Sequence, residues 1–251
     1  MDGQLIEFKN LPSRGLGYPE DIEIYVKPLT IKEQIDMDRY GISQAEYFQI
    51  ILNGITIHGN FNKNNLLYAD VQFIDVVRRL YSFDVKDKII LKGETCNYRD
   101  CQNEFDYEFT MDQIEFTDFN KDIFGKHFIF NKGGEDELEI VVSPLTVSEF
   151  ISMSKKARLY QSKKTALSDT FFEYCCVCTR EIVGREFKTK DERDAFLKGY
   201  LGSITSATDK KTLKAIEDET VVTIKPFKVI CENCGRETEV MVQPTSNFQQ
   251  E

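Results

Sequence analysis

Alternating apolar residues occur in two short segments of the chain, 22–26 and 138–142. The alternating positions are Ile22, Ile24 and Val26 in the first segment, and Leu138, Ile140 and Val142 in the second. A period of two is typical of a strand with one buried face. Pro28 and Pro144 follow these segments and lack a backbone donor, so we expect each strand to end there.

Each predicted strand lies between a second strand and a helix. Shorter apolar segments at 5–11 and 126–131 precede them and predict two β-hairpins. After each proline comes a threonine with a glutamate three residues later, the pattern of a capping box that opens a helix. These pairs are Thr30 with Glu33 and Thr146 with Glu149.

The two regions are related in sequence. Residues 22–37 and 138–153 are identical at nine of sixteen positions at a constant offset of 116, which indicates an internal duplication. Residues 47–55 and 171–179 match at an offset of 124, and both predict helices. Ser43 and Glu46 form a capping box before the first of these helices.

Further helices are predicted at 68–83, with Asp70 as a cap, and at 190–203 and 208–218. The predicted copies are residues 1–119 and 120–251, and the second carries an insert near 186–218.

Each copy ends on strands that flank a cysteine pair, Cys96 with Cys101 and Cys231 with Cys234. A glutamate stands three residues after each pair. Structural zinc takes four protein ligands in a tetrahedron, often from two such knuckles. The sequence therefore predicts one structural Zn²⁺ per chain, bound by these four cysteines. We expect an α+β fold with two duplicated halves whose knuckles meet in a zinc-ribbon-like core. On this model Cys231→Ser loosens the association of the halves.

Unliganded thiols and a degenerated site remain alternatives for the four cysteines. Cys175, Cys176 and Cys178 stand together in a predicted helix, where a metal or redox role is an alternative to core packing. Cysteine behaves as a small apolar residue in protein cores, and these residues align with an apolar helix in the first copy, so core packing is favoured.

The net charge is −10, from 42 acidic and 32 basic residues. This balance disfavours nucleic-acid binding, which depends on basic side chains. Basic residues cluster at Lys155, Lys156, Arg158, Lys163 and Lys164, where a solvated helix face is the simpler interpretation. The sequence has no long apolar run of the kind that spans a membrane and no secretory pattern at its N-terminus. We therefore expect a cytoplasmic protein with reduced thiols.

Catalytic motifs are not evident in the sequence. The segment "PSRGLGYP" lacks the Gly-Lys-Ser/Thr of a phosphate loop, and its glycines suit positive φ angles in a hairpin connection. His58 and His127, the two histidines of the sequence, are far apart and are interpreted as structural. Glu135 and Asp136 lie in a predicted turn. We expect no enzymatic activity and no small-molecule substrate.

Several short motifs follow one another in a fixed order along the chain. "LPSRGLGY", "IEIYVKPLT", a cysteine knuckle, "LEIVVSPLTVSEF", "CENCGRETEV" and "PTSNF" follow one another along nearly the whole chain. This order resembles the baseplate hub or hub-assembly proteins of contractile-tailed, T-even-like bacteriophages. The first knuckle departs from the expected spacing, with four residues between its cysteines rather than two.

The resemblance implies a non-enzymatic structural or assembly protein that binds other baseplate or tail hub proteins, and neither nucleic acid nor a membrane. It implies a place in the host cytoplasm during assembly or in the tail baseplate of the virion. The insert near 186–218 and the hairpin turns are candidate partner contacts, because exposed loops carry function on a rigid frame. The alternative is a zinc-ribbon module of the transcription or nucleic-acid machinery.

Overall fold

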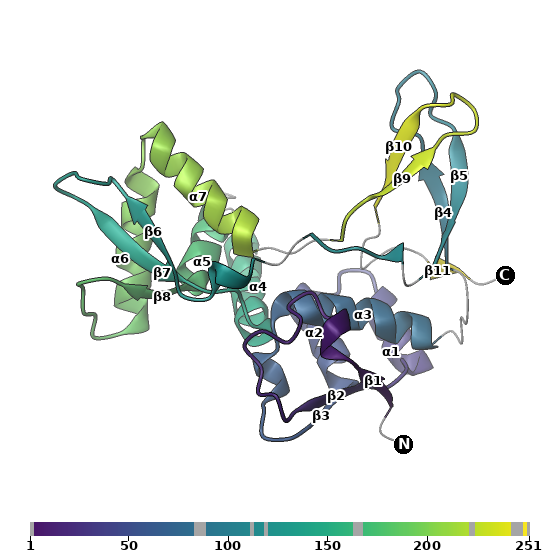
Figure 1. Ribbon diagram of the computed structural model, residues 1–251, viewed down its shortest axis with the longest axis horizontal. Helices are drawn as coiled ribbons and strands as arrows, with labels where there is room; N and C mark the ends of the chain where they lie inside the picture. The colour runs from purple at the N-terminus through teal and green to yellow at the C-terminus, as the bar shows by residue number, and fades with distance from the viewer. Residues whose placement is uncertain are drawn as a thin grey trace.

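The computed structural model describes residues 3–82, 89–110, 113–117, 120–162, 168–220, 224–241 and 248–249. The chain forms three lobes (Figure 1): a first α+β lobe, a second α+β lobe, and a smaller β lobe that projects beyond them. The mixed α+β class predicted from the sequence is confirmed. In the described part of the chain, no helix is both long and apolar enough to cross a membrane.

The first lobe contains an antiparallel sheet of order β1-β2-β3. Its strands are β1 (Gln4–Ile6), β2 (Glu23–Val26) and β3 (Ile55–His58). Its helices are α1 (Ile31–Asp38), α2 (Gln44–Asn53) and α3 (Tyr68–Ser82), with short 3-10 turns η1 (Phe8–Asn10) and η2 (Lys63–Asn65). The first predicted strand is shorter than expected, because η1 follows directly after Glu7.

The second lobe contains an antiparallel sheet of order β6-β7-β8. Its strands are β6 (Lys126–Phe130), β7 (Leu138–Val142) and β8 (Thr179–Ile182). Its helices are α4 (Val147–Ser162), α5 (Ser168–Cys178), α6 (Lys190–Ser203) and α7 (Ala207–Thr220), preceded by the 3-10 turn η4 (Lys121–Ile123). The two sheets thus have the same order, with two helices between their second and third strands.

The β lobe combines strands from the middle of the chain with strands near its C-terminus. One sheet has the order β11-β4-β5, from β4 (Ile89–Thr95), β5 (Glu104–Phe109) and β11 (Phe248–Gln249). The other is the antiparallel hairpin of β9 (Phe227–Ile230) and β10 (Glu237–Val240). Val76 of α3 belongs to the same small apolar cluster as Leu91, Phe109 and Val240, so the β lobe has its own core on one side of α3.

The predicted buried strand faces and the helix starts at the three capping boxes are confirmed. Ile22, Ile24 and Val26 are buried, and so are Leu138, Ile140 and Val142. The capping boxes at Thr30 and Ser43 are complete, and Thr146 and Glu149 exchange the same two hydrogen bonds. Each box satisfies backbone donors that the first helical turn leaves without a partner.

Asp70 does not cap its helix, contrary to the prediction. The helix begins at Tyr68, whose backbone N–H donates to the Leu145 carbonyl at 2.9 Å, so Asp70 lies inside the first turn. Its buried carboxylate instead accepts hydrogen bonds from Ser13 and Tyr18 in the loop between β1 and β2.

Each α+β lobe contains an arginine that ties its strand-to-helix turn to the next helix and to the capping glutamate. Arg78 donates to the carbonyls of Lys27 and Ile50, at 2.8 Å each, and to Glu33 at 2.9 Å. Arg180 donates to the carbonyls of Pro144 at 2.8 Å and Val177 at 3.3 Å, and to Glu149. The two lobes therefore repeat this arrangement with arginines from different elements.

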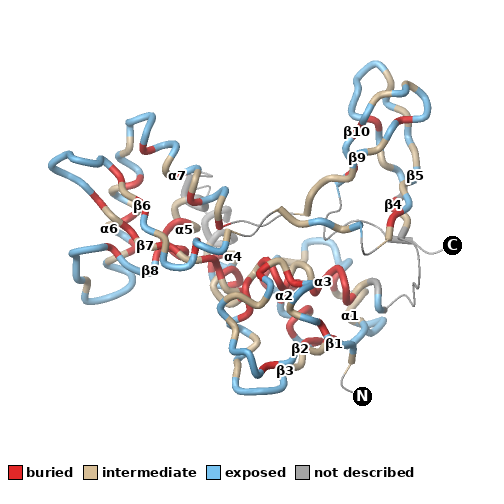
Figure 2. The backbone as a smooth tube through the Cα atoms, viewed as in Figure 1, coloured by how far each residue is buried: buried red, intermediate tan, exposed pale blue. Residues whose placement is uncertain are grey.

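The two α+β lobes share one hydrophobic core. Figure 2 shows buried residues concentrated where α2, α3 and α4 meet. The Phe150 ring stacks on Tyr68 with centroids 3.9 Å apart, and its edge meets Phe48 at 5.1 Å. A β-bridge between Leu67 and Thr146 extends this contact.

The sequence predicted that the cysteine knuckles join the two halves. In the structure, the two α+β lobes also pack directly against each other through their shared core. The β lobe does contain strands of both halves, but it is a second connection beside the shared core. The division into residues 1–119 and 120–251 stays a prediction, and residues 118 and 119 lie outside the described part of the chain.

Candidate metal centre

The four predicted ligand cysteines lie together at the tip of the β lobe. Cys96 Sγ is 3.8 Å from Cys234 Sγ, and Cys101 Sγ is 3.7 Å from Cys231 Sγ. All four sulfur atoms lie within 4.8 Å of one another. These separations are much longer than a disulfide bond of about 2.05 Å. Four thiolates at about 2.3 Å from a zinc ion in a tetrahedron would lie about 3.8 Å apart, so the cluster has the size of a tetrahedral thiolate site.

Two β-hairpin turns position the sulfur atoms. Cys96 N–H donates to the Asn103 carbonyl at 2.9 Å, and Cys231 N–H donates to the Arg236 carbonyl at 3.0 Å. Each turn is thus closed at its first cysteine, although the first turn is two residues longer. Residues 97–100, between the two cysteines of the first turn, are exposed to solvent, so the longer turn still brings both cysteines into the cluster.

The residue after the second cysteine of each pair has a positive φ angle. Gln102 has φ 47° and Gly235 has φ 68°. This left-handed conformation is favourable for glycine and uncommon for other residues. The glycine in "CENCGR" therefore has a conformational reason in the structure, and the first knuckle reaches the same conformation with a glutamine.

Side chains join the two knuckles across the cluster. Asn97 N–H donates to Thr238 Oγ1 at 3.0 Å. Arg236 donates to Asp100 at 2.7 Å, and its guanidinium carbon lies 4.1 Å from the centroid of the Tyr98 ring. Sequence patterns alone do not reveal these contacts, because the paired residues are more than 130 positions apart.

The thiols differ in acidity. A backbone hydrogen bond from Arg236, assisted by its side chain, lowers the pKa of the Cys234 thiol to about 6. A backbone hydrogen bond from Tyr98 acts in the same direction on Cys96, but burial and the neighbouring thiols outweigh it and raise the pKa of Cys96 to about 11. Thiolates are the form that binds metal. Cys234 is therefore the sulfur that ionises more readily of the two.

The same electrostatics bear on the nucleic-acid alternative. Arg236, next to the cluster, is paired with Asp100, and its side-chain hydrogen bond lowers the pKa of that carboxyl. The guanidinium is thus engaged by an acidic side chain of the same lobe. Lys163 and Lys164 of the basic cluster lie outside the described residues.

The other three cysteines are core residues, as predicted. Cys175, Cys176 and Cys178 are fully buried in the core shared by the α+β lobes. Burial is the largest cause of the raised pKa of each thiol, to about 12 for Cys176 and Cys178. Neutral thiols of this kind pack as apolar groups.

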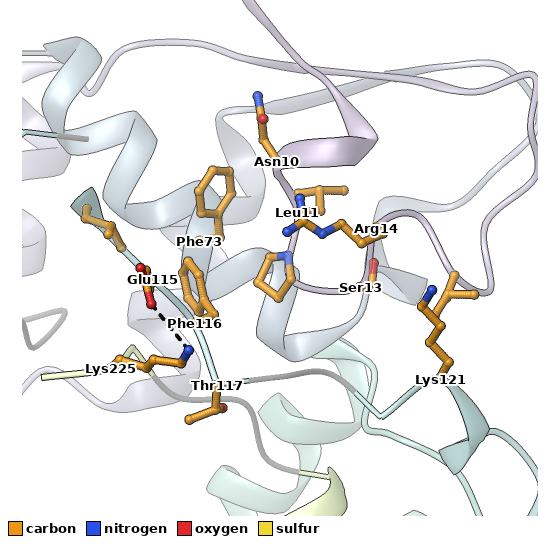
Figure 3. Close-up of a pocket in the computed structure, with 13 residues that line it drawn as sticks. Asn10, Leu11, Ser13, Arg14, Phe73, Glu115, Phe116, Thr117, Lys121 and Lys225 are labelled. Carbon is orange, nitrogen blue, oxygen red and sulfur yellow. Dashed lines mark hydrogen bonds and ion pairs between the residues drawn. The ribbon is translucent and has the colours of Figure 1, made fainter. Parts of the chain in front are cut away.

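The loop "PSRGLGYP" lines a pocket of about 830 Å³ between the first lobe and the linkers to the β lobe. Figure 3 shows Leu11 and Arg14 across from Glu115 and Phe116, with Glu115 paired to Lys225 at 3.3 Å. Gly15 and Gly17 have positive φ angles of 82° and 85°, as expected for the hairpin connection.

Asp70 accepts three hydrogen bonds from donors of this loop. It accepts from Ser13 N–H at 2.9 Å, from Ser13 Oγ at 2.5 Å and from Tyr18 Oη at 2.5 Å. Because these donors already bind the Asp70 carboxylate, the hydrogen bonds indicate a loop that is held in place by Asp70 rather than a phosphate-binding loop.

The histidines contact acidic or aromatic neighbours. His127 Nδ1 lies 2.6 Å from Glu139, and the His58 ring lies 4.8 Å from the Tyr25 ring between centroids. Both contacts link paired strands of a sheet, which agrees with the structural interpretation.

The family model described as T4 bacteriophage base plate protein matches residues 5–248. No curated protein and no solved structure matches the chain.

Proposed function

Since the chain belongs to the T4 bacteriophage base plate protein family, we propose that it is a non-enzymatic structural or assembly protein of the baseplate hub. It acts by binding other tail proteins. The family match, which covers residues 5–248, carries this proposal. The assignment to the hub, within the baseplate, rests on the order of motifs along the sequence, which resembles that of hub and hub-assembly proteins.

The two α+β lobes support a role as a rigid frame. Their sheets have the same strand order, and each lobe has a capping box tied by an arginine. Together with the sequence identity between residues 22–37 and 138–153, this supports an internal duplication. A frame with a shared core holds exposed loops and inserts in fixed positions, where partners can bind them.

The four cysteines of the β lobe hold one structural Zn²⁺ in this proposal. Four sulfur donors suit zinc, and a site with four protein ligands leaves no position open for a substrate. Structural zinc contributes about 10–16 kcal/mol of apparent binding free energy in small knuckles, and this energy stabilises the fold. In this chain it holds Cys96 and Cys101 of one hairpin to Cys231 and Cys234 of the other.

The test of the function is an affinity purification of the tagged chain from infected cells, followed by mass spectrometry. The expected result is recovery of hub, spike or tape-measure proteins of the tail. Analysis of mature particles then separates a virion component from a factor that acts only in assembly. Recovery of polymerase subunits or nucleic acid without tail proteins contradicts the proposal and favours the zinc-ribbon alternative.

A further inference from the structure

Helix α1 presents two aliphatic side chains to solvent. Ile31 is 78% exposed and Ile35 is 65% exposed. They stand four residues apart, so they lie on the same face of the helix, one turn from each other. Isolated exposed isoleucines need no explanation, but a pair on one helix face forms a small apolar surface.

The same positions are buried in the second lobe. At the offset of 116, Ile31 corresponds to Val147 and Ile35 to Ile151. Val147 is 0% exposed and Ile151 is 9% exposed, and both belong to the core that the two α+β lobes share. The two corresponding helices therefore differ in the burial of these apolar positions, since α4 has this face covered and α1 does not.

The surface that covers α4 is visible in the structure. It is a helical surface of the first lobe with aromatic and aliphatic side chains. Phe48 of α2 and Tyr68 of α3 contact Phe150, and Val147 N–H donates to the Leu66 carbonyl at 2.8 Å. In Figure 1, α1 lies at the opposite end of the first lobe from α4, so this surface does not reach it.

We infer that the α1 face binds a helical, aromatic-lined surface on another tail protein, in the way that α4 binds α2 and α3. This inference rests on the proposed assembly function and specifies a surface for it. Gln34 stands where α4 has Phe150, so on α1 this face consists of Ile31 and Ile35 without an aromatic side chain.

A second copy of the chain does not fit this surface. Its own α4 already covers the surface formed by Phe48 of α2 and Tyr68 of α3, and both copies carry a net charge of −10. In addition, α1 has Asp36 and Asp38 where α4 has Ser152 and Ser154. These carboxylates favour a partner surface with lysine or arginine at its rim, because complementary charge selects the partner.

Photo-crosslinking in infected cells tests the inference. The probe is p-benzoylphenylalanine in place of Gln34, with the same probe in place of Val183 as the control, since Val183 is an exposed aliphatic residue of the second lobe. The expected result is a crosslink from position 34, absent from position 183, to a helical segment of another tail protein with apolar residues flanked by lysine or arginine. The double variant Ile31→Asp, Ile35→Asp is expected to weaken recovery of that protein roughly tenfold.

The outcomes separate the surface from the function. Both isoleucines are exposed, so an unchanged melting temperature of the double variant shows that it folds. No crosslink above the control, a crosslink to a second copy, or unchanged recovery of tail proteins by the double variant overturns the inference while the assembly function stands. A wild-type chain that recovers no tail protein contradicts the function itself.

Discussion

Asp70 is a buried carboxylate that fixes the long connection between β1 and β2. It receives three hydrogen bonds, from the backbone and hydroxyl of Ser13 and from the hydroxyl of Tyr18. Burial is the main cause of the raised pKa of this carboxyl, and the hydrogen bonds oppose it. The network therefore offsets the cost of burying a charge and holds the loop that lines the pocket.

Replacing this carboxylate tests its role as an anchor. Asp70→Ala leaves the buried donors of Ser13 and Tyr18 without their acceptor, so we expect a loss of about 2–4 kcal/mol in the free energy of unfolding. Urea unfolding followed by circular dichroism measures the loss. Asp38→Ala, at an exposed position of α1, is the control and should change the free energy by less than about 0.5 kcal/mol.

Cys231 is the most buried of the four clustered cysteines and pairs with Cys101 at 3.7 Å between sulfur atoms. Cys231→Ser removes one thiolate, and we expect the zinc content to fall from one per chain to well below one. Elemental analysis of the purified protein measures this content. Cys176→Ala, in the core of the α+β body, should keep its zinc, and a wild-type chain without zinc would contradict the site.

At the scale of elements, α4 decides how the two α+β lobes meet. Its residues Val147, Phe150 and Ile151 enter the shared core. Local sequence places both helices correctly, through their capping boxes. It does not distinguish the helix that is covered from the helix that is exposed, because that depends on the position of α2 and α3 in space.

The contact of Phe150 with Tyr68 and Phe48 provides the test at this scale. Phe150→Ala creates a cavity between α2, α3 and α4, and we expect a loss of about 3–5 kcal/mol in the free energy of unfolding. Thermal and urea unfolding measure it. Ile35→Ala, one helix turn into exposed α1, should change the free energy by less than about 0.5 kcal/mol. Equal losses for the two variants would show that α4 is not packed as described.

On the scale of the whole molecule, the described residues form two separate apolar cores. The larger one lies in the two α+β lobes and the smaller one in the β lobe. The smaller core has few residues, and small domains of this kind usually depend on a metal or disulfides for stability. The β lobe should therefore unfold independently of the rest.

Metal removal tests this division. A chelator such as EDTA, or acid that protonates the thiolates, should release zinc and unfold the β lobe while the α+β body remains folded. Hydrogen exchange read by mass spectrometry should show lost protection in 89–109 and 227–240 and unchanged protection in β2 and β7. Loss of protection in β2 and β7 together with the β lobe would show that zinc holds the α+β lobes together, as the sequence alone suggested.

Sequence patterns missed three strands, β3, β8 and the short β11, and they missed the packing of α3 against α4. β3 and β8 follow directly after α2 and α5, and the apolar helical patterns obscured the short strands "ITIH" and "TREI". Alternation of Ile55 and Ile57 was a usable signal for the first. No comparable signal marks the stack of Tyr68 on Phe150, since the two side chains are remote in sequence and suit many partners.

The sequence by itself determined the local structures and which four cysteines come together. The capping boxes, the buried faces of β2 and β7 and the four cysteines depend on spacing between near neighbours, which physical chemistry relates directly to backbone structure. Only the tertiary structure decided that the α+β lobes share a core, that Asp70 anchors a loop, and that α1 is exposed where α4 is covered. These features arise from contacts between distant segments, whose energies depend on shape and burial that the order of residues does not display.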